Sequence, residues 1–600
     1  MIIRLQEKFN FDELLIALGR RGPDSIGINN ARVLPNPLNS DFQHECLEFT
    51  SSVVTCELQF VGATLQLRGS ELVKQPISDS NGNILVYNGE IFGGLDVSDG
   101  RNDGEVLMES LSNVSNEVNE VPNILSMIKG PWSLIYWQES TKTLWFGRDA
   151  FGRRSLLVHW PSLGDGRFIL SSVSPTFSSG TDNSTFWEEL PCGIHSVQIT
   201  LASPAIGQVR QHEWANEKLL NIIRWERICV EPICVAQDNN TSVVKSAQCV
   251  LKALRNSVRL RSKINRRNHD AIVPIAVLFS GGLDSMIIAA LLNEFLNSSY
   301  TIDLLNVSFD SESAPDRISA KAGLKELMKI APRRRWTLVE IDADLSCLTY
   351  EMDHVTRLLN PSSTFMDLNI GTALWLAARG DGWVSKESER IKYKSEAPIV
   401  MVGSGADEQC AGYGRHRTKY RNSRWIGLDE EMRVDMQRIW KRNMGRDDRC
   451  ICDNGKEGRF PFLDEDFIET LLKIPLWEIA NLDEPSGVGD KKILRQVAKL
   501  LGLHEVAILP KRAIQVCFCG KYFYFGSTVS VWFSLGLESR ENQTERILVV
   551  TVLLIWLLLG LLSLIYNVSI SYLEFVKWRS SALAYILYQI TKSSSMFYVT

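Results

Sequence analysis

A glycine-rich string in the middle of the chain is the strongest chemical signal in the sequence. Residues 280–285 read SGGLDS and follow a continuous apolar run at 273–280. Backbone N–H groups at the start of a helix attract anions, and glycines let the chain approach phosphate oxygens closely. The two serines can add hydroxyl donors, and the aspartate can bind Mg²⁺. A glycine pair alone would indicate only a tight turn, but the full string predicts a pyrophosphate-binding loop made of Ser280, Gly281, Gly282, Leu283, Asp284 and Ser285.

The residues around this loop must form the strands and helices that position it. Continuous apolar runs predict buried strands, and stretches with helical spacing lie between them. The predicted strands are 273–280, 303–310, 336–342 and 398–405, and the predicted helices are 286–296 and 317–329. Strands buried on both faces and separated by helices indicate a doubly wound parallel sheet, so an α/β fold class is expected.

The first 200 residues follow a different pattern, in which short strands alternate with turn signals. Residues 132–138 and 144–149 predict a hairpin joined by a polar turn, and their alternation predicts a sheet with one buried face. Residues 201–244 are less regular, and 236–244 reads as a polar linker. The sequence therefore predicts a β-rich domain over 1–200, a connector over 201–244 and a second domain from 245.

Composition and charge narrow the class of protein. The 600 residues are 45% hydrophobic and 22% charged, which is typical of globular chains and excludes a disordered or fibrous one. A net charge of −5 gives no electrostatic reason to expect nucleic acid as a partner. The 12 cysteines are scattered without a dense framework, and the first residues lack the apolar core of a signal peptide. These features predict a cytoplasmic protein.

The end of the chain differs from the rest. Residues 516–600 change abruptly in composition, and 547–573 contains no charged residue. Such a run is long enough to cross a bilayer core of about 30 Å. One interpretation is a membrane anchor at the end of a cytoplasmic protein. The other, which we favour, is that 516–600 is read-through of an unspliced intron, because the change falls inside a motif rather than in a linker.

Motifs along most of the chain, about residues 10–515, resemble those of the asparagine synthetase family. In the second half they are LFSGGLDS (278–285), PDRISAKAG (315–323), MDLNIGTALWLAARG (366–380), VGSGADEQCAGYGRHR (402–417), RDDRC (446–450), EGRFPFLDE (457–465) and KKILRQVAK (491–499). In the first half they are RRGPDS (20–25), YNGEIF (87–92), NDGE (102–105) and GRDAFGRRSLL (147–157). The resemblance implies an N-terminal α+β amidotransferase (Ntn-type) sandwich and an ATP pyrophosphatase domain over 245–515.

The family resemblance also implies two linked activities. One domain hydrolyses glutamine to ammonia with an N-terminal cysteine. The other uses ATP and Mg²⁺ to convert aspartate to β-aspartyl-AMP, which ammonia converts to asparagine with release of AMP and pyrophosphate. The implied small-molecule partners are therefore ATP, aspartate, and ammonia or glutamine. A homodimer is left open.

Individual residues of this sequence match the family's synthetase site. Asp284 and Asp407 resemble the carboxylates that hold Mg²⁺ and pyrophosphate, and Lys491 and Arg495 are the cations expected near the transferred group. Asp407 is also a candidate catalytic residue, and further ATP contacts are implied at Val307, Gly403, Ser404 and Gly405. The alternatives are helix N-capping for the two carboxylates and a solvated helix face for the two cations.

The glutamine site departs from the family pattern. Met1 is followed by Ile2, and the nearest cysteines are Cys46 and Cys56. In the family an arginine holds the glutamine carboxylate. Its position aligns near Leu65 of this sequence, and Arg68 lies three places away. Three positions still match, namely Asn88 and Gly89 of the oxyanion pair and Asp103, which holds the glutamine amino group. We therefore expect an amidotransferase-like domain without glutaminase activity. A gene model that has lost its first exon would show the same pattern.

A second departure concerns the synthetase site. In the family's SGEGSDE loop a glutamate acts near the reacting ammonia, and VGSGADE places Ser404 there. Serine is not a general base of comparable strength at pH 7. Three hypotheses follow: an aspartate-adenylating ligase that accepts free ammonia, a nucleotide-binding pseudo-enzyme that regulates a partner, and a ligase for another carboxylate and amine.

Overall fold

The structure is a computed structural model that describes residues 2–4, 12–33, 56–114, 120–162, 165–174, 187–199, 207–232, 239–263, 273–309, 314–344, 348–386 and 389–510. These residues belong to one compact unit, Met1–Cys517. The apolar segment 547–573 lies outside the described residues. Within the described ranges, no helix is long and apolar enough to cross a membrane.

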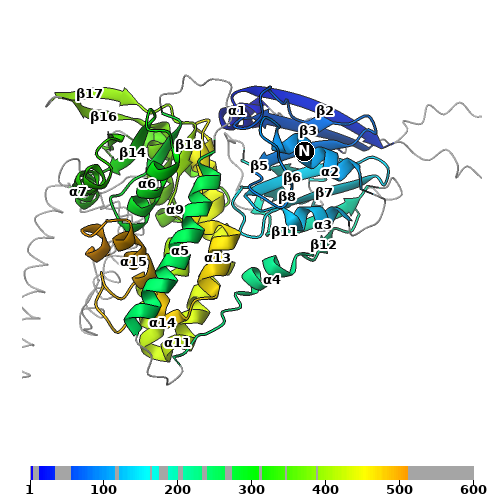
Figure 1. The fold of residues 1–600 in the computed structure, drawn as a ribbon. Helices are drawn as coiled ribbons and strands as arrows, with labels where there is room; N and C mark the ends of the chain where they lie inside the picture. The colour runs from blue at the N-terminus through cyan, green and yellow to red at the C-terminus, as the bar shows by residue number, and fades with distance from the viewer. Residues whose placement is uncertain are drawn as a thin grey trace, which may run out of the picture. The chain divides into compact units, whose positions relative to one another are not determined.

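The N-terminal part is a sandwich of two six-stranded antiparallel sheets (Figure 1). The first sheet has the order β10-β8-β9-β1-β3-β2, with β1 (Ile2–Arg4), β2 (Ser25–Val33), β3 (Cys56–Thr64), β8 (Leu157–His159), β9 (Phe168–Ser171) and β10 (Glu188–Glu189). The second has the order β12-β11-β7-β6-β5-β4, with β4 (Ile77–Ser78), β5 (Ile84–Gly89), β6 (Trp132–Gln138), β7 (Thr143–Arg148), β11 (Gly193–Gln198) and β12 (Arg210–His212). β12 lies in the predicted connector, so the second sheet extends past residue 200.

The predicted hairpin forms as β6 and β7, but the prediction of one buried face is wrong. All seven residues of β6 are buried. Ile135 and Trp137 belong to the core between the two sheets, whereas Leu134 and Tyr136 pack in a second core that includes residues of α2 (Asp103–Ser112) and α3 (Glu120–Met127). Because helices cover the outer face of the second sheet, its central strands are apolar on both faces.

The C-terminal part contains a seven-stranded sheet of the order β17-β16-β15-β14-β13-β18-β19. The strands are β13 (Ile275–Leu278), β14 (Thr301–Ser308), β15 (Arg335–Asp342), β16 (Asp381–Lys386), β17 (Glu389–Lys394), β18 (Ile399–Met401) and β19 (Glu457–Arg459). β13, β14, β15, β18 and β19 pair in parallel, and the hairpin of β16 and β17 extends one edge antiparallel. The α/β fold class is confirmed, although β18 is shorter than predicted because 402–405 forms a loop.

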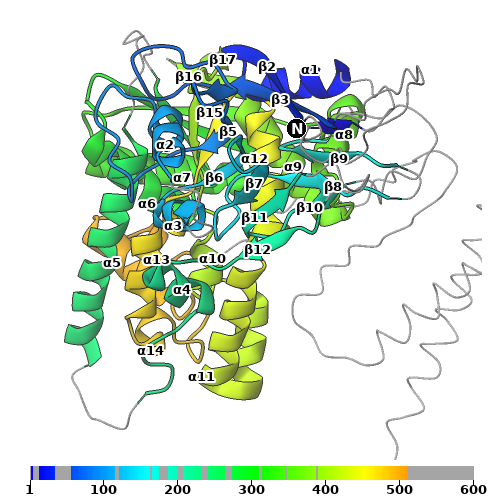
Figure 2. The same cartoon turned by 90° about the vertical axis from the view of Figure 1, so that its right-hand side faces the viewer.

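Helices cover this parallel sheet. The longer ones are α5 (Asn239–Arg261), α6 (Leu283–Phe295), α7 (Pro315–Ile330), α8 (Thr349–Leu359), α9 (Phe365–Arg379), α11 (Gly414–Gln437), α12 (Gly445–Cys452), α13 (Glu465–Leu472) and α15 (Lys492–Leu500). Local sequence sets their ends: the Thr364 hydroxyl caps the start of α9, and Gly380 ends it at a φ of 74°. α5 and α13, far apart in sequence, lie side by side (Figures 1 and 2).

The chain leaves β13 for β14 and β15 on one side and returns to β18 on the other. Such a reversal of strand order is where ligands bind in doubly wound sheets.

Buried ion pairs join the N-terminal sandwich to the C-terminal part. Arg153, which follows β7, donates to Asp149 at 2.9 Å, to Glu465 at 2.5 Å and to the carbonyl of Leu463 at 2.7 Å. Three further arginine contacts cross the same boundary, Arg21–Asp448, Arg154–Glu457 and Arg449–Glu189. Since these side chains are almost completely buried, each depends on its partner for hydrogen bonds that water cannot supply.

We predict that Arg153→Met destabilises the chain strongly. The substitution leaves Asp149 and Glu465 buried without their common guanidinium, and breaking a buried pair from one side costs about 3–5 kcal/mol. Arg255→Met is the matched control, because Arg255 pairs with Glu294 at an exposed position and should cost less than about 1 kcal/mol. The urea midpoint of the full chain measures both. Equal midpoints for the two variants would contradict the prediction.

Candidate functional site

The predicted phosphate loop lies between β13 and α6. Gly282 caps α6 without a side-chain hydrogen bond, so the partial positive charge of the helix N-terminus faces the loop. Gly281 has a φ of 70°, and a Cβ there would lie 2.3 Å from the carbonyl oxygen of Ser319 in α7. Ser285 donates to the Gly282 carbonyl at 3.1 Å, and the Ser280 hydroxyl accepts from the Gly282 N–H at 3.3 Å. Only glycine fits at position 281, because the loop packs against the backbone of α7, and the predicted approach to phosphate oxygens stays a prediction.

A second loop, 402–405, comes to the same edge of the sheet. It follows β18, which pairs in parallel with β13, so both loops leave the carboxyl ends of adjacent strands. A Cβ on Gly403 would lie 3.1 Å from the Cβ of Asp284. Gly405 has a φ of 100° and caps the short helix α10 (Ala406–Gln409), which carries Asp407. The structure therefore brings the two predicted carboxylates, Asp284 and Asp407, to one place.

Lys491 lies between these carboxylates. Its ammonium contacts Asp284 Oδ2 at 2.6 Å and Asp407 Oδ1 at 2.7 Å. Only 2% of Lys491 is exposed, so it does not lie on a solvated helix face. Burial lowers the pKa of the ammonium, but the two carboxylates outweigh burial and leave that pKa above its usual value. Neither carboxylate is an N-cap residue, since glycines hold both caps.

Glycine 412 makes room for this cluster. Its N–H donates to the Asp407 carbonyl at 2.9 Å. A Cβ at this position would lie 1.9 Å from Asp407 Oδ1 and 2.5 Å from Lys491 Cε. The Asp407–Lys491 contact thus depends on the absence of a side chain at residue 412.

The other predicted synthetase residues lie around the cluster without joining it. Val307 is half-buried near the carboxyl end of β14, the strand beside β13. Arg495 lies one turn beyond Lys491, but its guanidinium donates to Asp490 and to the carbonyls of Ala507 and Leu509. Its expected place near the transferred group stays a prediction, and its contacts instead hold the residue that precedes Lys491.

Ser404 makes a contact that the sequence did not indicate. Its hydroxyl donates to Asp447 Oδ2 at 3.0 Å, from the loop to α12. A second acidic residue, Glu408, is buried beside Asp407 and accepts from Tyr413 at 2.6 Å and from Asn443 at 3.0 Å. Burial raises the pKa of Glu408. Neither Asp447 nor Glu408 was among the residues expected from the sequence, although they lie within the motifs RDDRC and ADEQ.

The expected glutamine-site residues are brought together in the N-terminal part. Asn88 and Gly89 end β5, and Asp103 begins α2. The Asp103 carboxylate accepts from the Ile91 N–H at 3.0 Å, and burial raises its pKa. Arg68 donates to the Ile91 carbonyl at 2.8 Å and contacts Glu90 at 2.7 Å. Cys56 begins β3, is buried, and has a pKa raised by burial, and Cys46 lies outside the described residues.

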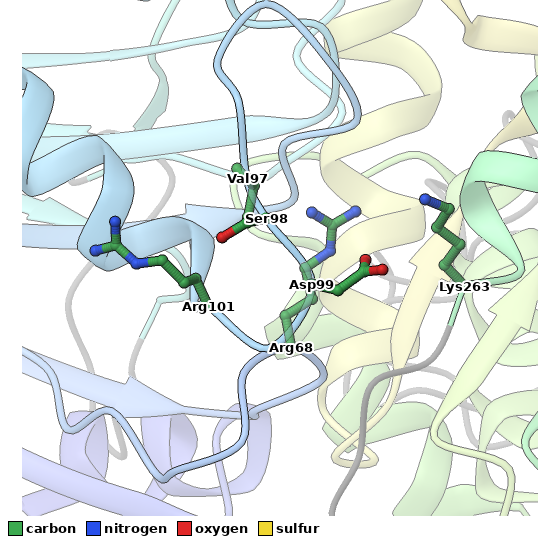
Figure 3. A pocket seen from close by; sticks show the side chains of 6 residues that line it. All are labelled: Arg68, Val97, Ser98, Asp99, Arg101 and Lys263. Atoms are coloured by element: carbon green, nitrogen blue, oxygen red, sulfur yellow. The ribbon is translucent and has the colours of Figure 1, made fainter.

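A small surface hollow lies beside these residues. Its lining consists of Arg68, Val97, Ser98, Asp99, Arg101 and Lys263 (Figure 3). Figure 3 shows the Asp99 carboxylate on the side of the hollow that faces Lys263. Arg101 forms an exposed ion pair with Glu109. Two of the three cations in the lining are paired within the chain, Arg68 with Glu90 and Arg101 with Glu109.

The expected Mg²⁺ site has two candidate carboxylates. In the parts of the chain that the structure describes, no group of three or more His, Cys, Asp or Glu side chains is arranged to hold a metal ion. Mg²⁺ in nucleotide sites is commonly held by one or two carboxylates together with the phosphates. Asp284 and Asp407 fit that donor set by their chemistry, because both supply carboxylate oxygens at the carboxyl ends of adjacent parallel strands.

Comparisons with known proteins agree with this division of the chain. A family model for a glutamine amidotransferase domain matches residues 63–179, and one for asparagine synthase matches 252–334 and 423–523. Asparagine synthetase domain-containing protein 1 from Homo sapiens is 34% identical, covering 84% of this chain and 91% of that protein. The Mus musculus protein of the same name is 36% identical, and the match covers 84% of this chain and 93% of that protein. The glutamine-hydrolysing asparagine synthetase of Gallus gallus is 23% identical, over 77% of this chain and 76% of that protein.

We predict that Gly412→Ala separates Lys491 from Asp407. The added methyl group overlaps the Asp407 carboxylate, and overpacking of this kind costs about 1–3 kcal/mol. Gly414→Ala is the matched control two residues away, since a Cβ there meets no atom within 4 Å. Thermal unfolding should show a lower midpoint for Gly412→Ala alone. A lower midpoint for both variants, or for neither, would count against the described packing.

Proposed function

The chain belongs to the asparagine synthetase family, in the branch of the asparagine synthetase domain-containing proteins, and on that premise we propose that it is an ATP-dependent amide-forming ligase. It adenylates an acidic amino acid, aspartate by family resemblance, and transfers the acyl group to ammonia. The observation that carries the proposal is the cluster of Asp284, Lys491 and Asp407 at the carboxyl ends of two adjacent parallel strands.

The proposed first step is attack of the substrate carboxylate on the α-phosphorus of ATP. The N–H groups at the start of α6 and the Ser280 and Ser285 hydroxyls bind the departing pyrophosphate. Asp284 and Asp407 would hold Mg²⁺, which supplies charge neutralisation of the triphosphate when bound. Lys491 is a fixed cation beside the phosphates and stabilises the negative charge that develops on them. Arg495 acts indirectly, because it anchors Asp490 and thereby the position of Lys491.

We propose free ammonia as the nitrogen source. The glutamine-site residues are engaged with the chain itself, since Asp103 and Arg68 both contact Ile91. These contacts support a structural role for the N-terminal part. The buried ion pairs that join it to the C-terminal part give the same support.

A nucleotide-binding pseudo-enzyme is the second candidate. Serine at position 404 favours it, because a hydroxyl alone is a poor proton acceptor in the amide-forming step. The two candidates differ in whether AMP and pyrophosphate are produced.

Aspartate-dependent exchange of pyrophosphate into ATP by the full chain should be detectable with Mg²⁺. Asp284→Asn should lower the exchange rate on the order of 100-fold, because it removes one carboxylate from the proposed metal and pyrophosphate site. Glu294→Gln, in the exposed ion pair at the other end of α6, is the control and should retain the rate. ATP binding without exchange for any acidic amino acid would sink the ligase proposal and favour the pseudo-enzyme.

Ammonium and glutamine should differ as nitrogen donors. We expect ammonium to support aspartate-dependent AMP release, and glutamine at the same concentration to support none above background, because glutamine must first be hydrolysed. The measurements are AMP release and glutamate release by the full chain. Glutamate release that is faster with ATP and aspartate present would show an active glutaminase and refute this part of the proposal.

A further inference from the structure

Amide formation at this site needs a proton acceptor. A neutral amine that attacks an acyl-adenylate must lose one proton before the amide is complete, and Asp284 and Asp407 are both engaged by Lys491. Ser404 lies in the 402–405 loop, next to Gly403, which approaches Asp284. Ser404 is half-buried in this loop, and in the proposed ligase its hydroxyl is the polar group of the loop next to Asp284. A serine hydroxyl becomes a useful acid–base group when a second base accepts its proton.

Asp447 is placed to be that second base. Only 2% of it is exposed, and its Oδ2 accepts the Ser404 hydroxyl at 3.0 Å. Its other oxygen, Oδ1, contacts the Arg446 guanidinium through Nε at 2.9 Å and through Nη2 at 2.8 Å. This two-point contact fixes the carboxylate plane, so that the second oxygen is directed at the loop.

The arginine is itself held in place. Arg446 Nη1 donates to Asp367 Oδ1 at 2.8 Å, and the hydroxyls of Ser362 and Thr364 donate to the other oxygen of Asp367. The chain of contacts therefore runs from the start of α9 through Arg446 and Asp447 to the loop. A carboxylate with such support keeps one orientation, which a proton acceptor requires.

We propose that Ser404 and Asp447 form a proton relay for the amide-forming step, an inference that rests on the ligase function proposed above. The amine nitrogen attacks the acyl carbon, the bond from that carbon to the AMP oxygen breaks, and AMP leaves with the electron pair. The nitrogen loses one proton to the Ser404 oxygen as the Ser404 proton passes to Asp447 Oδ2, and Asp447 then releases it to solvent. The products are the amide, AMP and one proton. Asp447 acts through Ser404 and is a positioning residue.

The test compares the two half-reactions in the full chain. Pyrophosphate exchange with aspartate reports adenylation, and ammonium-dependent AMP release reports amide formation. Asp447→Asn and Ser404→Ala should lower the ratio of AMP release to exchange by about 100-fold, the contribution typical of general acid–base catalysis. Asp453→Asn is the matched control, because Asp453 is a buried aspartate just after α12 that pairs with His354 and Trp375. Its ratio should equal that of the unmodified chain.

Rescue separates a relay from a merely structural contact. Ser404→Glu in the Asp447→Asn background places a carboxylate directly on the loop and should restore the ratio to within about 10-fold of the unmodified chain. An unchanged ratio in both single variants would overturn the relay and leave the ligase proposal intact. A lowered ratio without rescue would also overturn it, in favour of a structural role. Absence of exchange in the unmodified chain would overturn the ligase proposal and the relay together.

Discussion

The candidate synthetase site depends on one buried cation shared by two carboxylates. Asp284 and Asp407 come from two loops, and like charges held this close would separate without Lys491 between them. The parallel pairing of β13 and β18 brings the loops together, and glycines at 403 and 412 let the backbone approach. Burial of the ammonium strengthens its attraction for both carboxylates, because the surrounding dielectric is low. The approach of the two loops to each other therefore depends on this ion triad.

A second set of buried charges connects the two halves of the chain. The segment from β19 to α13 carries Glu457 and Glu465, which pair with Arg154 and Arg153 of the N-terminal sandwich. Arg459 in the same segment contacts Glu90, next to the expected glutamine-site residues. The N-terminal sandwich thus has a structural role, since it supplies the partners for charges that the C-terminal part buries.

The consequence of having serine at position 404 depends on the groups that the fold places around it. By itself it removes a carboxylate from the loop and weakens the case for amide formation. In the folded chain a carboxylate from α12 accepts the serine hydroxyl, and Arg446 fixes its orientation. In the proposed relay, this carboxylate takes the place of one on the loop itself.

The sequence by itself determined the features that local spacing controls. The strand, glycine pair and helix at 273–296 are adjacent in the chain, so their order predicted both the parallel sheet and the loop, and motif resemblance identified Asp284, Asp407 and Lys491. Only the tertiary structure decided which distant groups meet. Asp447 lies 43 residues from Ser404, and the Arg495 guanidinium donates to the carbonyls of Ala507 and Leu509. The burial of both faces of β6 likewise depends on helices that pack from elsewhere. Such contacts follow from how whole elements pack, and no periodicity along the chain encodes them.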